Sequence, residues 1–167
     1  MHVAGMVARI LQDDNAEAYI DTIGEGAGVF SRLCELGYKN AVSCKYSEGA
    51  RDLHDITGQH EFANMRAFLF WCVRDWLNPK NKMNPALPPN DKFAEEATEI
   101  HWKFVSDGKI IIEPKDDIKK RIGRSPDDFD ALANTSIQAT LSKVCPMRIL
   151  KMIFIVSRYN IPILLYI

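Results

Sequence analysis

The sequence lacks the features that define several common classes of protein. Its 167 residues include only four cysteines, none in a C-x-x-C pair, so neither a zinc site nor a disulfide scaffold is expected and a reducing compartment is the simpler interpretation. Net charge is almost absent, because 21 Lys and Arg residues offset 22 Asp and Glu residues. This balance excludes a strongly basic nucleic-acid binder of the histone type.

The motifs of several enzyme classes are missing as well. The four histidines have no metal-ligand spacing, and no Ser-His-Asp arrangement is visible. The glycine cluster 24–28 is followed by Val29, where a dinucleotide fingerprint requires glycine or alanine, and no phosphate-loop Lys-Ser/Thr follows it. The first 11 residues have no long apolar core and do not form a secretory signal.

What is present is the composition of a soluble globular protein, with 47% hydrophobic and 26% charged residues. The length fits one domain. Residues 17–23 are β-prone and end in the glycine cluster, residues 29–36 have helical periodicity and stop at Gly37, and residues 40–46 form a second predicted strand. This order predicts a βαβ unit with parallel strands.

The rest of the chain predicts mainly helices. An Asp107-Gly108 turn between two β-prone runs predicts a hairpin over 102–113. The predicted helices cover residues 3–11, 61–77, 91–101 and 126–143.

The composition changes at about residue 142. Residues 131–167 contain four basic residues and no acid. A transmembrane helix needs about 20 nearly uninterrupted apolar residues, but Lys151, Arg158 and Pro162 interrupt this run. We therefore divide the chain into a domain, 1–142, and an apolar basic tail, 143–167. The tail is a membrane span, a buried or oligomer-forming segment, or a segment foreign to the fold.

Three places carry possible chemistry. Asp21 ends a predicted strand, where side chains point into the ligand-binding crevice of an open α/β sheet, although it equally fits a cap on the glycine turn. Ser125 and Pro126 predict a helix start, with Asp127 and Asp128 in the first turn facing the helix dipole. Asp130 belongs to the same segment and lies at the edge of that helix's apolar face. The third place is the basic run Lys115, Lys119, Lys120, Arg121 and Arg124.

An acid at the rim of a core needs a partner, and a divalent cation is one candidate. The basic run is most often a solvated surface, yet beside an acidic site it also fits a phosphate backbone.

Two segments contain acidic motifs in a recognisable order. Residues 20–38 read IDTIGEGAGVFSRLCELGY, and residues 108–121 read GKIIIEPKDDIKKR and run into SPDDFDAL at 125–132. They resemble the second acidic motif, and the final strand with the third acidic motif, of the nuclease domain in tailed-bacteriophage terminase large subunits. A helix with Asn64, Arg66 and Trp71 lies between them, and the resemblance covers roughly residues 5–135.

The resemblance implies an α/β, ribonuclease H-like fold and a two-metal endonuclease that cuts concatemeric DNA during packaging. It implies Mg²⁺ or Mn²⁺ as cofactor, Asp21 and Asp130 as catalytic metal ligands, and Asp127 or Asp128 as an additional ligand. It also implies double-stranded DNA, the portal and the small terminase subunit as partners, no stable membrane association, and the cytoplasm of a bacterial host as location.

The sequence departs from the family in two ways. The opening strand meander with the first acid is missing, and so is the ATPase domain. We therefore expect a partial sheet of about three mostly parallel strands with an open edge, and impaired cleavage, as in a prophage remnant. A non-catalytic DNA-binding or packaging module and a small membrane-associated protein remain the alternatives.

Overall fold

The computed structural model describes residues 2–12, 17–87, 89–138, 152–156 and 162–166, and all structural statements concern these residues. The N-terminal part alternates helices and strands: α1 (His2–Ile10), β1 (Glu17–Asp21), α2 (Gly26–Glu35) and β2 (Ala41–Cys44). Strands β1 and β2 are parallel, with Asp21 paired to Cys44. The predicted βαβ unit is therefore confirmed.

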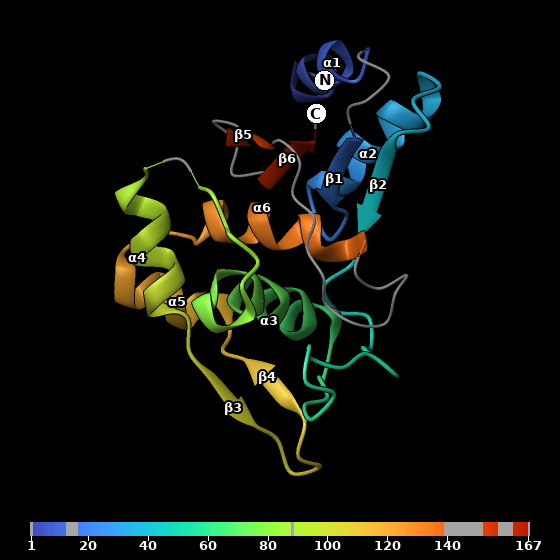
Figure 1. Cartoon of the computed structure of the whole chain (residues 1–167). Helices are drawn as coiled ribbons and strands as arrows, with labels where there is room; N and C mark the ends of the chain where they lie inside the picture. The colour runs from blue at the N-terminus through green and yellow to red at the C-terminus, as the bar shows by residue number, and fades with distance from the viewer. Residues whose placement is uncertain (1, 13–16, 88, 139–151, 157–161, 167) are drawn as a thin grey trace.

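The middle of the chain contributes helices and a hairpin. Its elements are α3 (Met65–Leu77), the short 3-10 helix η1 (Pro79–Asn81), α4 (Asp91–Glu99), β3 (Trp102–Phe104), β4 (Ile110–Ile112), α5 (Lys115–Ile122), α6 (Asp127–Thr135) and the 3-10 helix η2 (Ser136–Gln138). Strands β3 and β4 form the predicted antiparallel hairpin, and Gly108 has the positive φ of 82° that its turn needs. The hairpin projects from the body below α3 (Figure 1).

Several boundaries differ from the sequence prediction. Helix α3 begins after Asn64, whose side chain accepts a hydrogen bond from the Ala67 amide, whereas residues 61–64 were predicted as helix. Phe62 instead forms a bridge with Ile110. Helix α5 was not predicted, because its one buried apolar side chain, Ile118, gives no visible periodicity.

The C-terminal tail supplies two strands, β5 (Met152–Val156) and β6 (Pro162–Tyr166). Strand β6 pairs antiparallel with β1, and β5 with β6, so the sheet has the order β2-β1-β6-β5. The α/β fold with a small parallel sheet and flanking helices is confirmed. About three mostly parallel strands were predicted, whereas the described sheet contains one parallel pair, β1 and β2. The sheet was also expected to have an open edge, but β6 pairs with the free edge of β1.

Helices cover both faces of the sheet. On one face, Ala18 and Ile20 of β1 pack in a cluster with α1 and α2. On the other face, α6 packs against β1 and β6 and lies between the sheet and α3 (Figure 1). Because α6 is covered on both sides, all nine of its residues are buried, including Asp130 at 2% exposure. Asp130 was predicted at the edge of an apolar face, and this greater burial is a tertiary effect.

Candidate active site

Asp21 occupies the carboxyl end of β1 and faces α6. Side chains alternate between the two faces of a strand, and Ile20 points into the cluster formed with α1 and α2. Asp21 therefore points to the opposite face. Cys44, its partner in register, makes a sulfur contact of 3.9 Å with the Asn134 carbonyl oxygen of α6, which confirms the direction of this face.

The turn after β1 fixes the Asp21 carboxylate. Its Oδ1 accepts a hydrogen bond of 3.0 Å from the Ile23 amide. Helix α2 then begins so close to β1 that a Cβ added to Gly26 would lie 1.9 Å from the Asp21 carbonyl oxygen. Glycine at this position is required by the close approach of two backbone segments. The Asp21 carboxylate also caps the turn that leads into the glycine cluster.

Asp130 approaches the same place from α6. Its Oδ2 accepts a hydrogen bond of 2.6 Å from Lys115 Nζ, at the start of α5. Lys115 also donates to Asp127 Oδ1 at 3.2 Å. The other oxygen of Asp130, Oδ1, is buried and has no hydrogen-bond partner among the described residues.

The two carboxylates interact electrostatically. Burial raises the pKa of Asp21, and the negative charge of Asp130 raises it further. Burial also raises the pKa of Asp130, although the ammonium of Lys115 and the guanidinium of Arg66 offset part of that effect. The site therefore holds two acids in an environment that disfavours two negative charges.

Two residues of the middle region support Asp130. The Tyr46 hydroxyl, just after β2, donates a hydrogen bond of 2.7 Å to the Asp130 carbonyl oxygen. Burial raises the pKa of Tyr46 well above its ordinary value, and the charge of Asp130 adds to this. Arg66 donates to the Glu113 carbonyl oxygen at 2.7 Å. It thereby ties α3 to the segment that leads into Lys115.

Helix α6 begins without the cap that the sequence predicted. The residue before it is Pro126, not Ser125, and proline has no side-chain acceptor for a helix amide. Glu96 of α4 takes this role, because its Oε2 accepts a hydrogen bond of 2.9 Å from the Phe129 amide. Burial raises the pKa of Glu96 to about 7, and Asp128 adds to the rise.

Sequence analysis missed Glu96, although a signal was present. Glu96 lies three residues after Phe93, so it shares the inward face of the predicted helix, and it is 1% exposed. An acid on the buried face of a helix needs a donor, and the start of a following helix is a common source.

The two first-turn acids have partners of their own. Asp127 receives the second hydrogen bond of Lys115. Asp128 Oδ2 accepts a hydrogen bond of 3.3 Å from Asn90, which also caps α4 by accepting from the Phe93 amide. Asp128 is thus directed toward α4, whereas Asp127 and Asp130 share one lysine.

Most of the predicted DNA-binding run forms ion pairs within the chain. Besides Lys115, three of its cations have acidic partners: Lys120 with Asp117, Arg121 with Glu99 and Glu113, and Arg124 with Glu95 and Glu96. Within the part of the chain that the structure describes, Lys119 is the member of the run without an ion pair, and it is exposed. Ion pairing of neighbouring residues was not visible in the linear sequence, because most of the acids lie on other elements.

The residues fit a single hard cation better than a pair. Asp130 Oδ1 is a buried oxygen in need of a partner, and carboxylate oxygens are the ligands that Mg²⁺ and Mn²⁺ prefer. Across the described ranges, no group of three or more His, Cys, Asp or Glu side chains is arranged to hold a metal ion. Asp130 Oδ1 is therefore the oxygen of this site that a divalent cation would satisfy, and Asp21 lies close enough for the two charges to interact.

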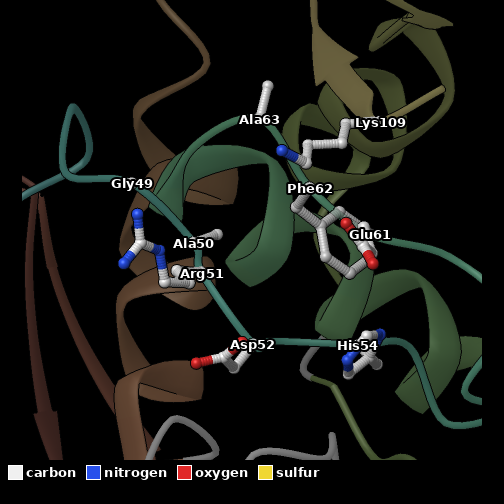
Figure 2. Close-up of a pocket in the computed structure, with 9 residues that line it drawn as sticks. All are labelled: Gly49, Ala50, Arg51, Asp52, His54, Glu61, Phe62, Ala63 and Lys109. Atoms are coloured by element: carbon white, nitrogen blue, oxygen red, sulfur yellow. The ribbon is translucent and has the colours of Figure 1, made fainter. Parts of the chain in front are cut away.

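A separate hollow of about 280 Å³ lies on the loop that follows β2. Figure 2 shows Arg51 and Asp52 on one side of it and Lys109 and Glu61 on the other. Its charges are mixed, and neither Asp21 nor Asp130 lines it. It is therefore distinct from the acid site.

No described helix is long and apolar enough to span a bilayer.

Comparisons with known proteins find matches among solved structures. No protein-family model matches the chain, and no curated protein matches it. Among solved structures, the chain is similar to a mutant of the nuclease domain of the large terminase subunit gp2 of bacterial virus Sf6, solved with manganese and beta-thujaplicinol, at 23% identity and a TM-score of 0.49.

A second mutant structure of gp2 from bacteriophage Sf6, solved with calcium, is similar at 24% identity and a TM-score of 0.49, and the match covers 75% of this chain and 63% of that one. The first match covers 76% of this chain. The chain spans about 64% of the length of that gp2 domain. The first of these two structures is a nuclease domain of a large terminase subunit, and the second is gp2c of a large terminase subunit.

Proposed function

We propose that this chain is a nuclease-type module of a phage DNA-packaging machine, in which Asp21 and Asp130 hold a divalent cation and double-stranded DNA is the substrate. The observation that carries the proposal is the convergence of two acids from separate, ordered motifs. The charge of Asp130 acts on Asp21, and Asp130 keeps a buried oxygen without a partner among the described residues.

The two acids have different tasks in this proposal. Asp130 is buried and forms the floor of the site, whereas Asp21 is half-buried at the end of its strand. A bound Mg²⁺ or Mn²⁺ would supply charge stabilisation and a more acidic water at the scissile phosphate. Lys115 holds one oxygen of Asp130 and one of Asp127, so its ammonium fixes these carboxylates and is positioned beside the negative charge of a phosphodiester.

Two carboxylates provide ligands for one cation, whereas the resemblance implies two metal ions and three acids. We therefore propose that cleavage by this chain is weaker than that of a three-acid site. Exposed Lys119, with Lys120, Arg121 and Arg124, is proposed to contact the DNA backbone. We also propose the portal and the small terminase subunit as partners, and the cytoplasm of a bacterial host as the location.

The test is nicking of supercoiled plasmid in the presence of Mn²⁺ or Mg²⁺. Asp21→Asn and Asp130→Asn should each reduce nicking about 100-fold or more, because each removes a charged ligand while keeping the side-chain shape. Asp116→Asn is the matched control, since Asp116 is exposed and lies in the neighbouring helix. Cleavage that survives both site substitutions would contradict the assignment.

One observation favours a second function, a non-catalytic DNA-binding module. Lys115 already compensates the charge of Asp130 without a metal ion. Such a module would bind DNA in a salt-sensitive manner, and binding would be weakened by changing Lys119, Lys120 and Arg121. Addition of EDTA separates the two functions. DNA binding by the non-catalytic module should not depend on a metal ion, so DNA binding that is lost with EDTA and restored by Mg²⁺ would exclude that module.

A further inference from the structure

Arg66 is a partly buried cation at the start of α3. Its amide donates a hydrogen bond of 3.1 Å to the Tyr46 carbonyl oxygen. Its Nη1 donates one of 2.7 Å to the Glu113 carbonyl oxygen, and its guanidinium carbon lies 4.6 Å from the centroid of the Phe70 ring. The guanidinium is therefore held in one place by a backbone carbonyl and an aromatic face.

The residues that hold Arg66 also surround Asp130. The Tyr46 hydroxyl donates to the Asp130 carbonyl oxygen at 2.7 Å. The Phe70 ring lies 4.9 Å from the ring of Phe129, the residue before Asp130. Glu113 precedes by two residues the lysine that binds Asp130 Oδ2. The contacts of Arg66 thus place its charge beside the acid site.

This charge acts on both acids through space. Burial raises the pKa of Asp21 and of Asp130, and the guanidinium of Arg66 opposes the rise in each case. Among the described residues Arg66 forms no ion pair, and its Nη2 has no hydrogen-bond partner. Its positive charge is therefore compensated by the acid site as a whole rather than by one carboxylate in contact.

The number of charges at the site limits what it can bind. Asp21, Asp127 and Asp130 carry three negative charges when ionised, whereas Lys115 and Arg66 carry two positive ones. An arginine stays protonated, so its share of this charge is constant. One negative charge is left over, which attracts a first divalent cation, and the site with that cation bound is positive and repels a second.

We propose that Arg66 is a positioning residue of the acid site, a fixed counter-charge that holds Asp21 and Asp130 together without a metal ion and sets the affinity of the site for a divalent cation. The proposal rests on the proposed function, because it requires that these two acids bind such a cation. A purely structural Arg66 would join α3 to the segment before Lys115 and would not repel a metal ion.

The experiment measures the Mn²⁺ affinity of the full chain near neutral pH without DNA, by electron paramagnetic resonance of the free ion. Arg66→Gln and Arg66→Met remove the charge, so both should bind Mn²⁺ about three- to tenfold more tightly. Arg66→Lys keeps the charge and should stay within about twofold of wild type. Arg74→Gln is the matched control, because Arg74 lies on the same helix and also covers an aromatic ring, but pairs with Asp75.

Tighter Mn²⁺ binding in the neutral variants, with Arg66→Lys and Arg74→Gln unchanged, supports the proposal. A folded neutral variant that binds Mn²⁺ as wild type does, or more weakly, overturns it, and so does Arg66→Lys that binds as tightly as Arg66→Gln. Circular dichroism shows which variants fold. If neither neutral variant folds, the proposal is overturned as well, because Arg66 is then required for the fold itself.

Asp130→Asn separates this proposal from the proposed function. If wild type binds no Mn²⁺, or binds it no better than Asp130→Asn does, the metal site is wrong and the role of Arg66 fails with it. If Asp130→Asn weakens Mn²⁺ binding and the neutral Arg66 variants match wild type, the metal site stands and the role of Arg66 alone is overturned.

Discussion

The two carboxylates of the candidate site are held in place by different means. Asp21 is fixed by its own strand, by the Ile23 amide and by the glycine turn, all within a dozen residues. Asp130 depends on Lys115 and on Tyr46, and its helix depends on Glu96. The strand side of the site is therefore a local structure, whereas the helix side is an assembly of distant elements. A single substitution should disrupt the strand side of the site. Substitutions on the helix side should each reduce the free energy of unfolding by a smaller amount.

The largest effect is expected at Gly26. Replacing it with alanine places a Cβ 1.9 Å from the Asp21 carbonyl oxygen, so β1 or α2 must move and the free energy of unfolding should fall by about 3 kcal/mol. Chemical denaturation measures this loss. Gly28→Ala is the control, because no atom lies within 4 Å of its Cβ position. It should be neutral or stabilising by up to about 1 kcal/mol, as for alanine within a helix; equal losses in both variants would contradict the local account.

The next effect concerns Glu96 and depends on pH. Its pKa rises from an ordinary 4.5 to about 7, so the folded state binds more protons than the unfolded state between these values. Its contribution to stability is therefore greatest below pH 4.5 and is lost as pH rises through about 7. Between pH 5 and pH 8 this loss should reach roughly 2–3 kcal/mol.

Glu96→Gln tests this expectation, since the amide oxygen still accepts from Phe129 but does not titrate. The variant should lack this part of the pH dependence, whereas Glu96→Ala should be less stable at every pH by about 1–3 kcal/mol. Urea denaturation at both pH values gives the comparison. Parallel pH profiles for wild type and Glu96→Gln would show that this carboxyl titrates normally.

A smaller effect is expected at Lys115. Burial lowers the pKa of its ammonium, but Asp130 and Asp127 outweigh this and the net pKa is raised. Lys115→Ala removes the cation from Asp130, so unfolding should become easier by about 1–2 kcal/mol near pH 7. The loss should grow as pH rises, because the pKa of Asp130 rises further and ionising it then destabilises the fold.

Added Mn²⁺ should restore part of the stability of Lys115→Ala if the two acids bind a cation. Lys120→Ala is the control, because its partner Asp117 is exposed and such pairs contribute little. A variant that Mn²⁺ does not stabilise would count against Asp130 as a metal ligand.

The smallest effect is expected at Tyr46. Tyr46→Phe removes one buried hydrogen bond of 2.7 Å to the Asp130 carbonyl oxygen and should reduce stability by about 1 kcal/mol. Its ring stays packed against Phe70. Thermal unfolding measures the change, and an unchanged melting temperature would remove Tyr46 from the support of α6.

The same division between local and distant contacts determined what the sequence could predict. The βαβ unit was readable because strand, glycine turn and helix follow one another, and Asp21 could be singled out at the strand end. The hairpin was readable from Asp107 and Gly108. These features depend on the backbone preferences of adjacent residues.

The remaining features depend on tertiary contacts. Asp130 was predicted at an edge and is buried, because α6 lies between the sheet and α3. The ion pairs of Lys115 with two acids of α6 were not visible in the sequence, and its assignment to DNA binding stays a prediction. Helix α5 has no periodic signal of its own. The place of Glu96 on an inward helix face does not show which amide it meets across the fold, here that of Phe129. The assignments of Asp21 and Asp130 as metal ligands stay predictions.

The tail shows most clearly what the sequence alone could not predict. Its apolar, basic composition allowed a membrane span, an oligomer-forming segment or a foreign addition, but composition alone does not specify a strand partner. In the structure β5 and β6 join the sheet, with Ile163 opposite Ile20 of β1.

This pairing has a consequence for the order of folding. Strand β1 and β6 are about 140 residues apart, so at a synthesis rate of roughly 5–20 residues per second β1 emerges from the ribosome many seconds before its neighbour exists. During that interval one edge of β1 presents unpaired amide and carbonyl groups, which bind any other extended chain. The nascent protein should therefore be most prone to aggregate in the interval when β1 and β2 are paired and β6 has yet to appear.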